Sequence, residues 1–430
     1  EAGHYDFDAA KSLEATLERK ERIQQDIETL RRITEPCACG TQRPSYTPEY
    51  RLAIEYVKKR MKEFGLETRE DNAGNLYGVL AGTQKDAPKI ISGSHLDSVK
   101  CSGAYDGIAG VLCALEAARM IAESGAPLRH PLEVMGTIGE EGTRFGQALI
   151  GSQLVEGSWG EPQLDEFRGL EDGLTLRETM KAYGLPGSTT GVCRRDERVK
   201  AFIELHDEQG PILENAGISI GVVENIVAIS WMHITVHGLA SHPGTIPMSV
   251  RRDACVGACK LICAVTDYAR EHYDGEATVT AGKLEVFPGN TNCIPSRCDF
   301  TIDIRTCNGA YRDDLVRFIR EKKADVERAC RVTIDVREGM RQAPTALDAK
   351  VQQCIEDACK KLGYSWRRMN SGAGHDAMIF ARIWPTAMVF VQSHDGLTHH
   401  PDEYVPPEEL AKGADVLYET FRMLDAQRDD

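Results

Sequence analysis

The chain has a shortage of positive charge and no long apolar run. Its 430 residues contain 51 Lys plus Arg against 66 Asp plus Glu, which gives a net charge of −15. Nucleic acids and anionic membrane surfaces attract basic proteins, so this balance argues against both as partners. No apolar run approaches the roughly 18 residues that a membrane-spanning helix needs. We therefore expect a protein that binds neither nucleic acid nor membrane.

Several catalytic and structural patterns are also missing. The sequence has no GxSxG motif, which leaves a serine-hydrolase mechanism without support, and residues 107–110 hold only a fragment of the GxGxxG dinucleotide loop. It has no internal repeat. The content of 42% hydrophobic and 27% charged residues is that of a globular protein, not of a disordered or collagen-like chain. At roughly 150 residues per domain, the length predicts two or three domains, or one large domain with an insertion.

The 14 cysteines form no recognisable disulfide framework. The only close pair, Cys37 and Cys39, is CxC and not the CxxC of a zinc or redox site. Cys255, Cys259 and Cys263 recur every four residues, as in a helical stripe. We interpret the cysteines as reduced thiols that pack as small apolar groups. Such thiols are typical of a reducing compartment, and we expect a cytoplasmic protein.

Helix and strand patterns alternate over the first half of the chain and again at its end, as in a sheet covered by helices on both faces. The predicted helices are 11–32, 49–64, 108–123, 348–361 and a segment near 375–382, and the predicted strands are 89–94, 132–138, 201–205 and 386–392.

The middle of the chain has a different pattern, with the β-α-β-β-α-β order of a ferredoxin-like unit. Its predicted elements are strand 231–237, helix 248–271, strands 278–286 and 297–305, helix 311–328 and strand 332–336. We therefore predict an α/β catalytic domain with a mixed central sheet, formed by residues 1–226 and 339–430. An α+β domain, residues 227–338, interrupts it.

Histidines and carboxylates follow four of the predicted strands, at the sheet edge where open α/β sheets build their sites. The four segments are GSHLDSVKCSGAYDG with His95, Asp97 and Asp106, TIGEEGTRFG with Glu140 and Glu141, ELHDEQGP with His206, and GLTHHPDEY with His399 and His400. This mixture of nitrogen and oxygen ligands suits zinc, manganese, cobalt or nickel better than magnesium or calcium. The sequence therefore predicts a metal site, with Cys101 outside its ligand set.

The spacing within these segments indicates hydrolysis. His95 and Asp97 point the same way on an extended strand, so Asp97 can accept a hydrogen bond from the ring nitrogen that does not bind metal. One of the adjacent glutamates can hold a metal while its neighbour acts as general base. Two cations about 3.5–4 Å apart can clamp a carbonyl group. Together these features predict hydrolysis of an amide-type bond without a covalent intermediate.

With these motifs in view, the chain resembles the di-metal amidohydrolases of the M20 peptidase clan, in particular the carbamoylase and allantoate amidohydrolase branch. The resemblance covers about residues 14–424 and also includes the motifs SHPGTIPM, NCIP, DIR and SGAGHDA. It implies two divalent ions per subunit, with Glu140 as general base and Asp97 as the partner of His95. The implied metal ligands are His95, Asp106 as the bridging carboxylate, Glu141, His206 and His399.

The resemblance also implies that the inserted domain supplies substrate contacts and acts as a lid and dimerisation domain. His242 would reach the site of a neighbouring subunit and stabilise the oxyanion, which implies a homodimer. Arg305 would bind the substrate carboxylate, and Asn292 would contact the substrate. Further candidates for substrate binding are Gln209, Gly374 and His375.

The implied activity is hydrolysis of the ureido C–N bond of a small N-carbamoyl amino acid, α or β, to the amino acid, ammonia and carbon dioxide. Allantoate or ureidoglycolate amidohydrolase is the alternative. More distant ones are an aminoacylase or dipeptidase, or a non-catalytic scaffold. Ser230-Trp231 stands where many allantoate and α-amino-acid members carry an arginine. One cation fewer argues against a doubly anionic substrate tail, and Trp231 could offer an apolar wall.

Overall fold

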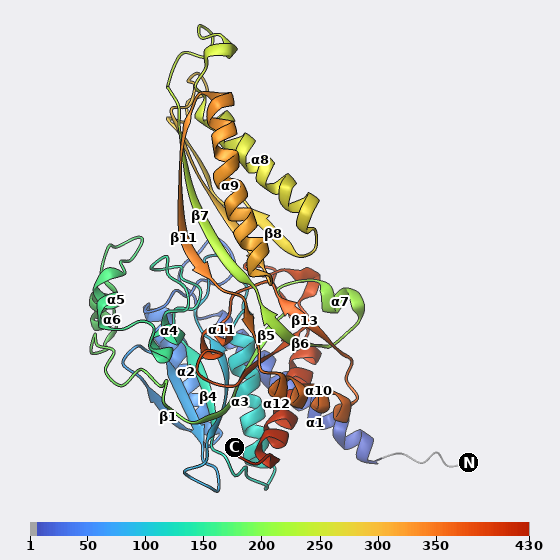
Figure 1. Cartoon of the computed structure of the whole chain (residues 1–430). Coiled ribbons are helices and arrows are strands. Elements are labelled where there is room, and N and C mark those ends of the chain that lie inside the picture. Colours follow the sequence, from blue (N-terminus) through green and yellow to red (C-terminus); the bar gives the residue numbers. More distant parts are fainter. Residues whose placement is uncertain (1–6, 430) are drawn as a thin grey trace. The chain divides into compact units, whose positions relative to one another are not determined.

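The computed structural model describes residues 7–429, with side chains from residue 18 onward (Figure 1). It divides into two compact units. The first unit comprises Glu1–Glu224, Leu347–Met369 and His375–Asp430, and the second comprises Asn225–Ala346 and Asn370–Gly374. Among the described residues, no helix is both long and apolar enough to cross a membrane.

A mixed sheet, with nine strands among the described residues, belongs mainly to the first unit and confirms the predicted fold class. The strand order is β1-β2-β4-β3-β5-β14-β6-β12, and β13 pairs with β6. The bounds are β1 Glu67–Glu70, β2 Leu76–Leu80, β3 Lys89–His95, β4 Leu132–Thr137, β5 Val199–Asp207, β6 Ile220–Ile226, β12 Thr345–Ala346, β13 Trp366–Ser371 and β14 Thr386–Val391.

The centre of this sheet is parallel, and its strands end at one edge. β3 pairs in parallel with β4 and β5, and β5 pairs in parallel with β14. His95 lies opposite Thr137, and Asp207 lies opposite Val391. Because these strands are buried on both faces, β14 is apolar along most of its length. The loops that follow β3, β4, β5 and β14, which carry the predicted metal ligands, therefore start close together.

Helices of the first unit pack on this sheet. α3 (Ile108–Glu123) is buried almost all round and contacts β3, β4 and β5, as well as α1 (Phe7–Arg31) and α12 (Pro407–Ala426). α10 (Ala349–Leu362) contacts β14 and α12, and α2 (Pro48–Glu63) contacts β1 and β2. The Thr47 side chain caps α2 by accepting a hydrogen bond from the backbone N–H of Tyr50. The short helices are α4 Ile150–Glu156, α5 Glu161–Glu166, α6 Leu176–Tyr183, α7 Ile212–Ala216 and α11 Ala377–Phe380.

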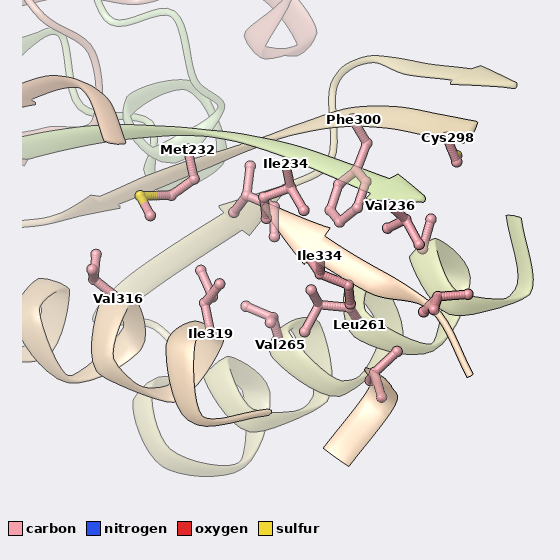
Figure 2. Close-up of a cluster of buried hydrophobic side chains, with 14 of the residues drawn as sticks. Met232, Ile234, Val236, Leu261, Val265, Cys298, Phe300, Val316, Ile319 and Ile334 are labelled. Atoms are coloured by element: carbon pink, nitrogen blue, oxygen red, sulfur yellow. The ribbon is translucent and has the colours of Figure 1, made fainter. Parts of the chain in front are cut away.

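The second unit has its own antiparallel sheet, in the order β11-β7-β10-β8 with β9 also on β10. Alternate residues of β10 are buried, and they pack with two helices into an apolar core (Figure 2). This is the order expected of a ferredoxin-like unit. The elements are β7 Ala228–His237, α8 Ala254–Tyr273, β8 Ala277–Thr280, β9 Leu284–Phe287, β10 Arg297–Thr306, α9 Gly309–Cys330 and β11 Thr333–Gln342.

Some element bounds differ from the sequence prediction. The helix predicted over 248–271 begins at Ala254, because Arg251 is extended and Asp253 caps the helix with its side chain. The strand predicted over 278–286 is two strands, β8 and β9, which pair with different parts of β10. The strands β1, β2, β6, β12 and β13 were not predicted; β1 has a burial pattern without fully buried positions.

Candidate functional site

Asp106 lies between a pair of histidines, His95 and His206, and a third histidine, His399, at the C-terminal edge of the parallel strands. Its Oδ1 is 3.3 Å from His95 Nε2 and 3.2 Å from His206 Nε2. Its Oδ2 is 3.0 Å from His399 Nε2, which is also 3.4 Å from Glu141 Oε2. A carboxylate in this position can bind one cation through each oxygen.

These residues form overlapping groups that could hold metal ions. The groups are His95, Asp106 and His206; His95, Glu140 and Glu141; and Asp106, Glu141 and His399, with the ligand atoms of each group within 4.8 Å of one another. The buried Oε1 of Glu141 has no hydrogen-bond partner, which leaves it available to a cation. Nitrogen and oxygen donors of this kind suit a divalent transition ion. The residues present therefore fit metal binding.

Glu140 is buried beside this group, and its Oε2 is 3.9 Å from His95 Nε2. Burial raises its pKa well above the usual value, and the charges of Asp376, Asp106 and Asp97 add to the effect, against the opposing charge of His95. Burial and the charges of Asp106 and Glu140 likewise raise the pKa of Glu141. A bound cation would favour the ionised carboxylates. Glu140 and Glu141 are therefore carboxylates whose ionised forms a nearby cation would stabilise.

The same carboxylates also shift the pKa values of the neighbouring histidines. Burial opposes protonation of His95 and His206, but the neighbouring carboxylates outweigh it and raise the pKa of both. Burial also opposes ionisation of Asp106, but hydrogen bonds from His206, His399 and His95 hold its pKa well below the usual value.

Asp97 organises the loop that carries both glutamates. Its carboxylate accepts hydrogen bonds from the backbone N–H groups of Gly139, Glu140 and Glu141, at 3.0, 3.2 and 3.3 Å. The Nδ1 of His95 is 3.0 Å from the Asp97 carbonyl oxygen and 3.9 Å from the carboxylate. Asp97 thus contacts His95 through its backbone and fixes the Glu140 loop through its side chain.

Arg43, which the sequence analysis did not identify, forms hydrogen bonds with the backbone next to Asp97. Its side chain is fully buried and donates to the carbonyl oxygens of Leu96, Leu30 and Ile33 at 2.9–3.0 Å. Burial lowers its pKa to about 10, and the charge of Asp97 opposes this shift. Arg43 is therefore a buried cation that joins the end of α1 to the loop that follows His95. No motif marks it, because its partners are backbone atoms brought together by the fold.

Gln209 and Glu403 form further hydrogen bonds with Asp106. Gln209 Nε2 donates to Asp106 Oδ2 at 3.1 Å and to Thr398 Oγ1 at 3.0 Å. Glu403 Oε2 accepts from the backbone N–H groups of Tyr105 and Asp106 at 2.9 and 3.3 Å. Burial and the charges of Asp207 and Asp106 raise the pKa of Glu403 to about 8. Gln209, a predicted substrate-binding residue, thus contacts a predicted metal ligand.

Two further buried carboxylates, Glu204 and Asp376, lie close enough to the group to affect its charges: Asp376 acts on Glu140, and His206 acts on Glu204. Glu204 accepts from Ser94 Oγ at 2.7 Å and from the backbone N–H of Ala377 at 2.8 Å, and Asp376 accepts from the hydroxyl of Thr137. Burial and the charge of Asp376 raise the pKa of Glu204 to about 7. Both residues lie in motifs that the sequence analysis used, ELHDEQGP and SGAGHDA. In those motifs, functional roles were predicted for the neighbouring residues and not for Glu204 or Asp376.

The structure also places the remaining candidates of the first unit. His375 is buried, and its ring centre is 4.6 Å from that of His206. His400 is exposed, and its Nδ1 accepts from the backbone N–H of Asp402 at 3.2 Å; it does not join the groups around Asp106, whereas His399 does. Gly107, with φ +69°, has no room for a side chain, because a Cβ would lie 2.4 Å from the His95 ring.

The other candidates belong to the second unit. Arg305 forms a bidentate pair with Asp303, from Nε to Oδ1 at 3.1 Å and from Nη2 to Oδ2 at 3.0 Å, and donates to the carbonyl oxygen of Gly372 at 3.1 Å; Gly374 is in the same loop segment. Trp231 Nε1 donates to Asp303 as well, at 3.2 Å. His242 and Asn292 are exposed, in the loops after β7 and before β10.

Comparison with known proteins agrees with this geometry. Residues 94–423 match the family described as Peptidase family M20/M25/M40. An N-carbamoyl-L-amino-acid amidohydrolase of Paenarthrobacter aurescens is 38% identical over 94% of this chain and 98% of its own length. An allantoate amidohydrolase of Escherichia coli is 35% identical over 93% and 96%.

A solved structure gives the same result. An amidase of the hydantoinase/carbamoylase family from Burkholderia multivorans matches with a TM-score of 0.86 and 31% identity, over 95% of this chain and 98% of that one. The predicted family resemblance is confirmed. The chain belongs to peptidase family M20/M25/M40, a family of metal-dependent hydrolases, and within it to the amidohydrolase branch of the carbamoylases and allantoate amidohydrolases.

Proposed function

We propose that this amidohydrolase cleaves the ureido C–N bond of an N-carbamoyl amino acid and releases the amino acid, ammonia and carbon dioxide. The observation that carries the proposal is the position of Asp106 between three histidines, with Glu140 beside them. Relatives named N-carbamoyl-L-amino-acid amidohydrolase, at 38% and 39% identity over 94% of the chain, support the substrate class.

The proposed cofactor is a pair of divalent ions, zinc or else manganese, cobalt or nickel. His95 and His206 would hold one ion, Glu141 and His399 the other, and Asp106 both. When bound, such ions polarise a carbonyl group and acidify water. The supporting feature is the position of the two Asp106 oxygens, which face different histidines.

Glu140 is the proposed general base. Its carboxylate accepts the proton of the attacking water and then passes that proton to the leaving nitrogen. Its burial beside His95 shields the carboxylate from bulk water. Asp97 keeps the Glu140 loop in position through three backbone hydrogen bonds.

Residues of the second unit would bind the substrate. Arg305 would exchange its pair with Asp303 for the substrate carboxylate and bind it through two parallel N–H donors, and Asn292 would contact the substrate. His242 would donate to the developing oxyanion in the site of a neighbouring subunit, so the active form would be a homodimer joined through the second unit, which would also close as a lid. Gln209, Gly374 and His375 would line the substrate pocket. The 14 free cysteines support a reducing, cytoplasmic location.

Allantoate or ureidoglycolate is the second candidate substrate. Relatives named allantoate amidohydrolase and ureidoglycolate hydrolase, at 35% and 34% identity, favour it. Two residues argue against it. Ser230 and Trp231 stand at the position where many allantoate-type members carry an arginine, and their side chains donate to Glu338 and Asp303. A carbamoyl amino acid with a single carboxylate needs one cation, which Arg305 can supply.

Product release from a substrate panel tests this proposal, with ammonia measured for the ureido substrates and free amino acid measured for the N-acetyl compound. The metal-loaded protein is assayed with N-carbamoyl-α-amino acids, N-carbamoyl-β-alanine, allantoate and ureidoglycolate, with an N-acetyl amino acid as the aminoacylase control. We expect the highest kcat/KM with an N-carbamoyl amino acid. A higher kcat/KM with allantoate or ureidoglycolate would select the second candidate, and preference for the N-acetyl compound would contradict both.

A further inference from the structure

Asp207, to which the proposed function gives no role, follows His206 at the end of β5 and is fully buried. Successive side chains of a strand point to opposite faces, so the sequence gives no sign that these two side chains meet. In the structure they do meet, because the Oδ1 of Asp207 lies 3.1 Å from the Nδ1 of His206. A buried carboxylate is therefore in contact with a predicted metal ligand.

The contacts of the His206 ring decide which of its nitrogens can bind a cation. Its Nδ1 is 2.9 Å from the backbone carbonyl oxygen of Asp207, which can only accept a hydrogen bond, so Nδ1 carries a proton. The other ring nitrogen, Nε2, lies 3.2 Å from Asp106 Oδ1. His206 therefore presents the lone pair of Nε2 to a cation bound beside Asp106.

The Asp207 carboxylate has few partners of its own. Its Oδ2 accepts a hydrogen bond from Ser393 Oγ at 3.2 Å, and its buried Oδ1 has no hydrogen-bond partner in the described part of the chain. Among the described residues no Lys or Arg pairs with this carboxylate, and its ion-pair partner is His206. A buried carboxylate without a cation is costly. A cation bound at Nε2 would polarise the His206 ring and place positive charge beside Oδ1.

His95 differs from His206 in this respect. Its Nδ1 is 3.0 Å from the carbonyl oxygen of Asp97, but the Oδ1 of Asp97 is 3.9 Å away. That carboxylate accepts three backbone hydrogen bonds from the Glu140 loop. Of the two histidines that face Asp106 Oδ1, His206 is therefore the one with a carboxylate available to polarise its ring.

We propose that Asp207 is a positioning residue for His206, and that it strengthens the ion held by His95 and His206 but not the ion held by Glu141 and His399. This inference rests on the pair of ions proposed above. The carboxylate holds the imidazole with Nε2 toward the ion and makes that nitrogen a stronger donor, as carboxylates behind metal-binding histidines do. Removal of its charge should therefore weaken one ion of the pair selectively.

Metal affinities resolved for each ion test the proposal. Asp207→Asn replaces the carboxylate with a neutral amide of the same shape. Dissociation constants for zinc are measured by chelator competition in the full-length protein and in His399→Ala, which should keep only the ion on the His206 side. We expect Asp207→Asn to weaken that ion by about 10–100-fold in both backgrounds and to leave the affinity for the other ion unchanged. The measurement needs no substrate, so the result does not depend on the proposed ureido activity.

Asp71→Asn is the matched control for a structural role. Asp71 is a buried aspartate of the same unit, and its carboxylate accepts hydrogen bonds from the backbone N–H groups of Ala73, Gly74 and Asn75 at 2.9–3.0 Å. This variant should lower the melting temperature of the metal-free protein and leave both metal affinities unchanged. A structural role and a role toward one ion therefore give different results.

A second neutral replacement, Asp207→Ser, should show the same selective loss. Equal weakening of both ions, or parent affinities in a folded Asp207→Asn, would overturn the proposal. Failure of both variants to fold would also overturn it, because Asp207 would then serve the fold and not one ion. If the parent itself bound fewer than one ion per chain, the proposed pair of ions would be contradicted, and the role of Asp207 with it.

Discussion

The candidate residues of the two units are held in opposite ways. Around Asp106 in the first unit, most of the neighbouring side chains are buried, and Asp97 alone accepts three backbone hydrogen bonds. In the second unit, His242 and Asn292 are exposed, and Arg305 is one-third exposed and paired with Asp303. The predicted metal ligands around Asp106 are preorganised by the fold, whereas the proposed substrate-binding residues can rearrange. Chemistry and specificity are therefore expected to respond differently to mutation.

Glu140→Gln should have the largest effect on the first unit. The amide keeps the shape of the side chain but cannot accept the proton of the attacking water, so we expect kcat to fall by about 10²–10⁴-fold. The metal content and the melting temperature should not change. Steady-state kinetics and elemental analysis of the same sample provide the measurement, and a fully active variant would show that Glu140 is not the base.

Asp97→Asn should weaken metal binding rather than chemistry alone. Its amide cannot accept three backbone hydrogen bonds as the carboxylate does, so the Gly139–Glu141 loop should lose its fixed position. We expect the metal affinity, measured by chelator competition, to fall about 10–100-fold. Asp402→Asn, at an exposed aspartate in the His400 loop, is the matched control and should bind metal as the parent does. Equal affinities in the two variants would contradict the role given to Asp97.

Arg305→Ala addresses the second unit. Loss of the guanidinium should raise KM for the preferred ureido acid by about tenfold, through loss of a charge-assisted hydrogen-bond pair, and leave the metal content unchanged. Arg297→Ala removes another arginine of β10, one that pairs with Asp299, and should change KM little. If both variants kept the parent KM, Arg305 would have no part in carboxylate binding.

A smaller effect is expected at Glu197, outside both sites. Although burial opposes ionisation, Arg194 and Lys89 lower its pKa to about 2. Because the folded pKa lies below the unfolded value, Glu197 should stabilise the protein above about pH 4.5, and this contribution should disappear as the pH falls toward 2. After allowance for partial exposure, we expect Glu197→Gln to lower the unfolding free energy by about 1–2 kcal/mol at pH 7.

Denaturant unfolding at several pH values measures this effect. The difference between Glu197→Gln and the parent should shrink steadily below about pH 4.5. Glu171→Gln, at an exposed glutamate, should differ by less than about 0.5 kcal/mol at any pH. A Glu197 difference that grew on acidification would contradict the sign of the pKa shift.

The sequence predicted the Asp106 group because its members follow strands whose apolar patterns are plain. The parallel pairing of β3, β4, β5 and β14 brings their C-terminal ends to one edge, so motif position alone brought His95, Glu141 and His206 together. His399 follows the last of these strands in the same way.

The residues that position the predicted ligands could not be predicted from motifs that follow strands. Arg43 binds backbone carbonyl groups of α1 and of the loop after β3, and backbone groups carry no sequence signal. Asp97 was expected to bind His95 through its carboxylate, but that carboxylate is used mainly by three N–H groups of another loop.

The central claim is that Asp106 joins two metal ions, and counting those ions tests it most directly. The protein is stripped with a chelator, reconstituted with zinc or manganese, freed of excess metal and analysed for metal per chain. We predict two ions per chain for the parent and for His400→Ala, and about one for His399→Ala, which lacks one ligand of the second ion. Fewer than one ion per chain in the reconstituted parent would contradict the account.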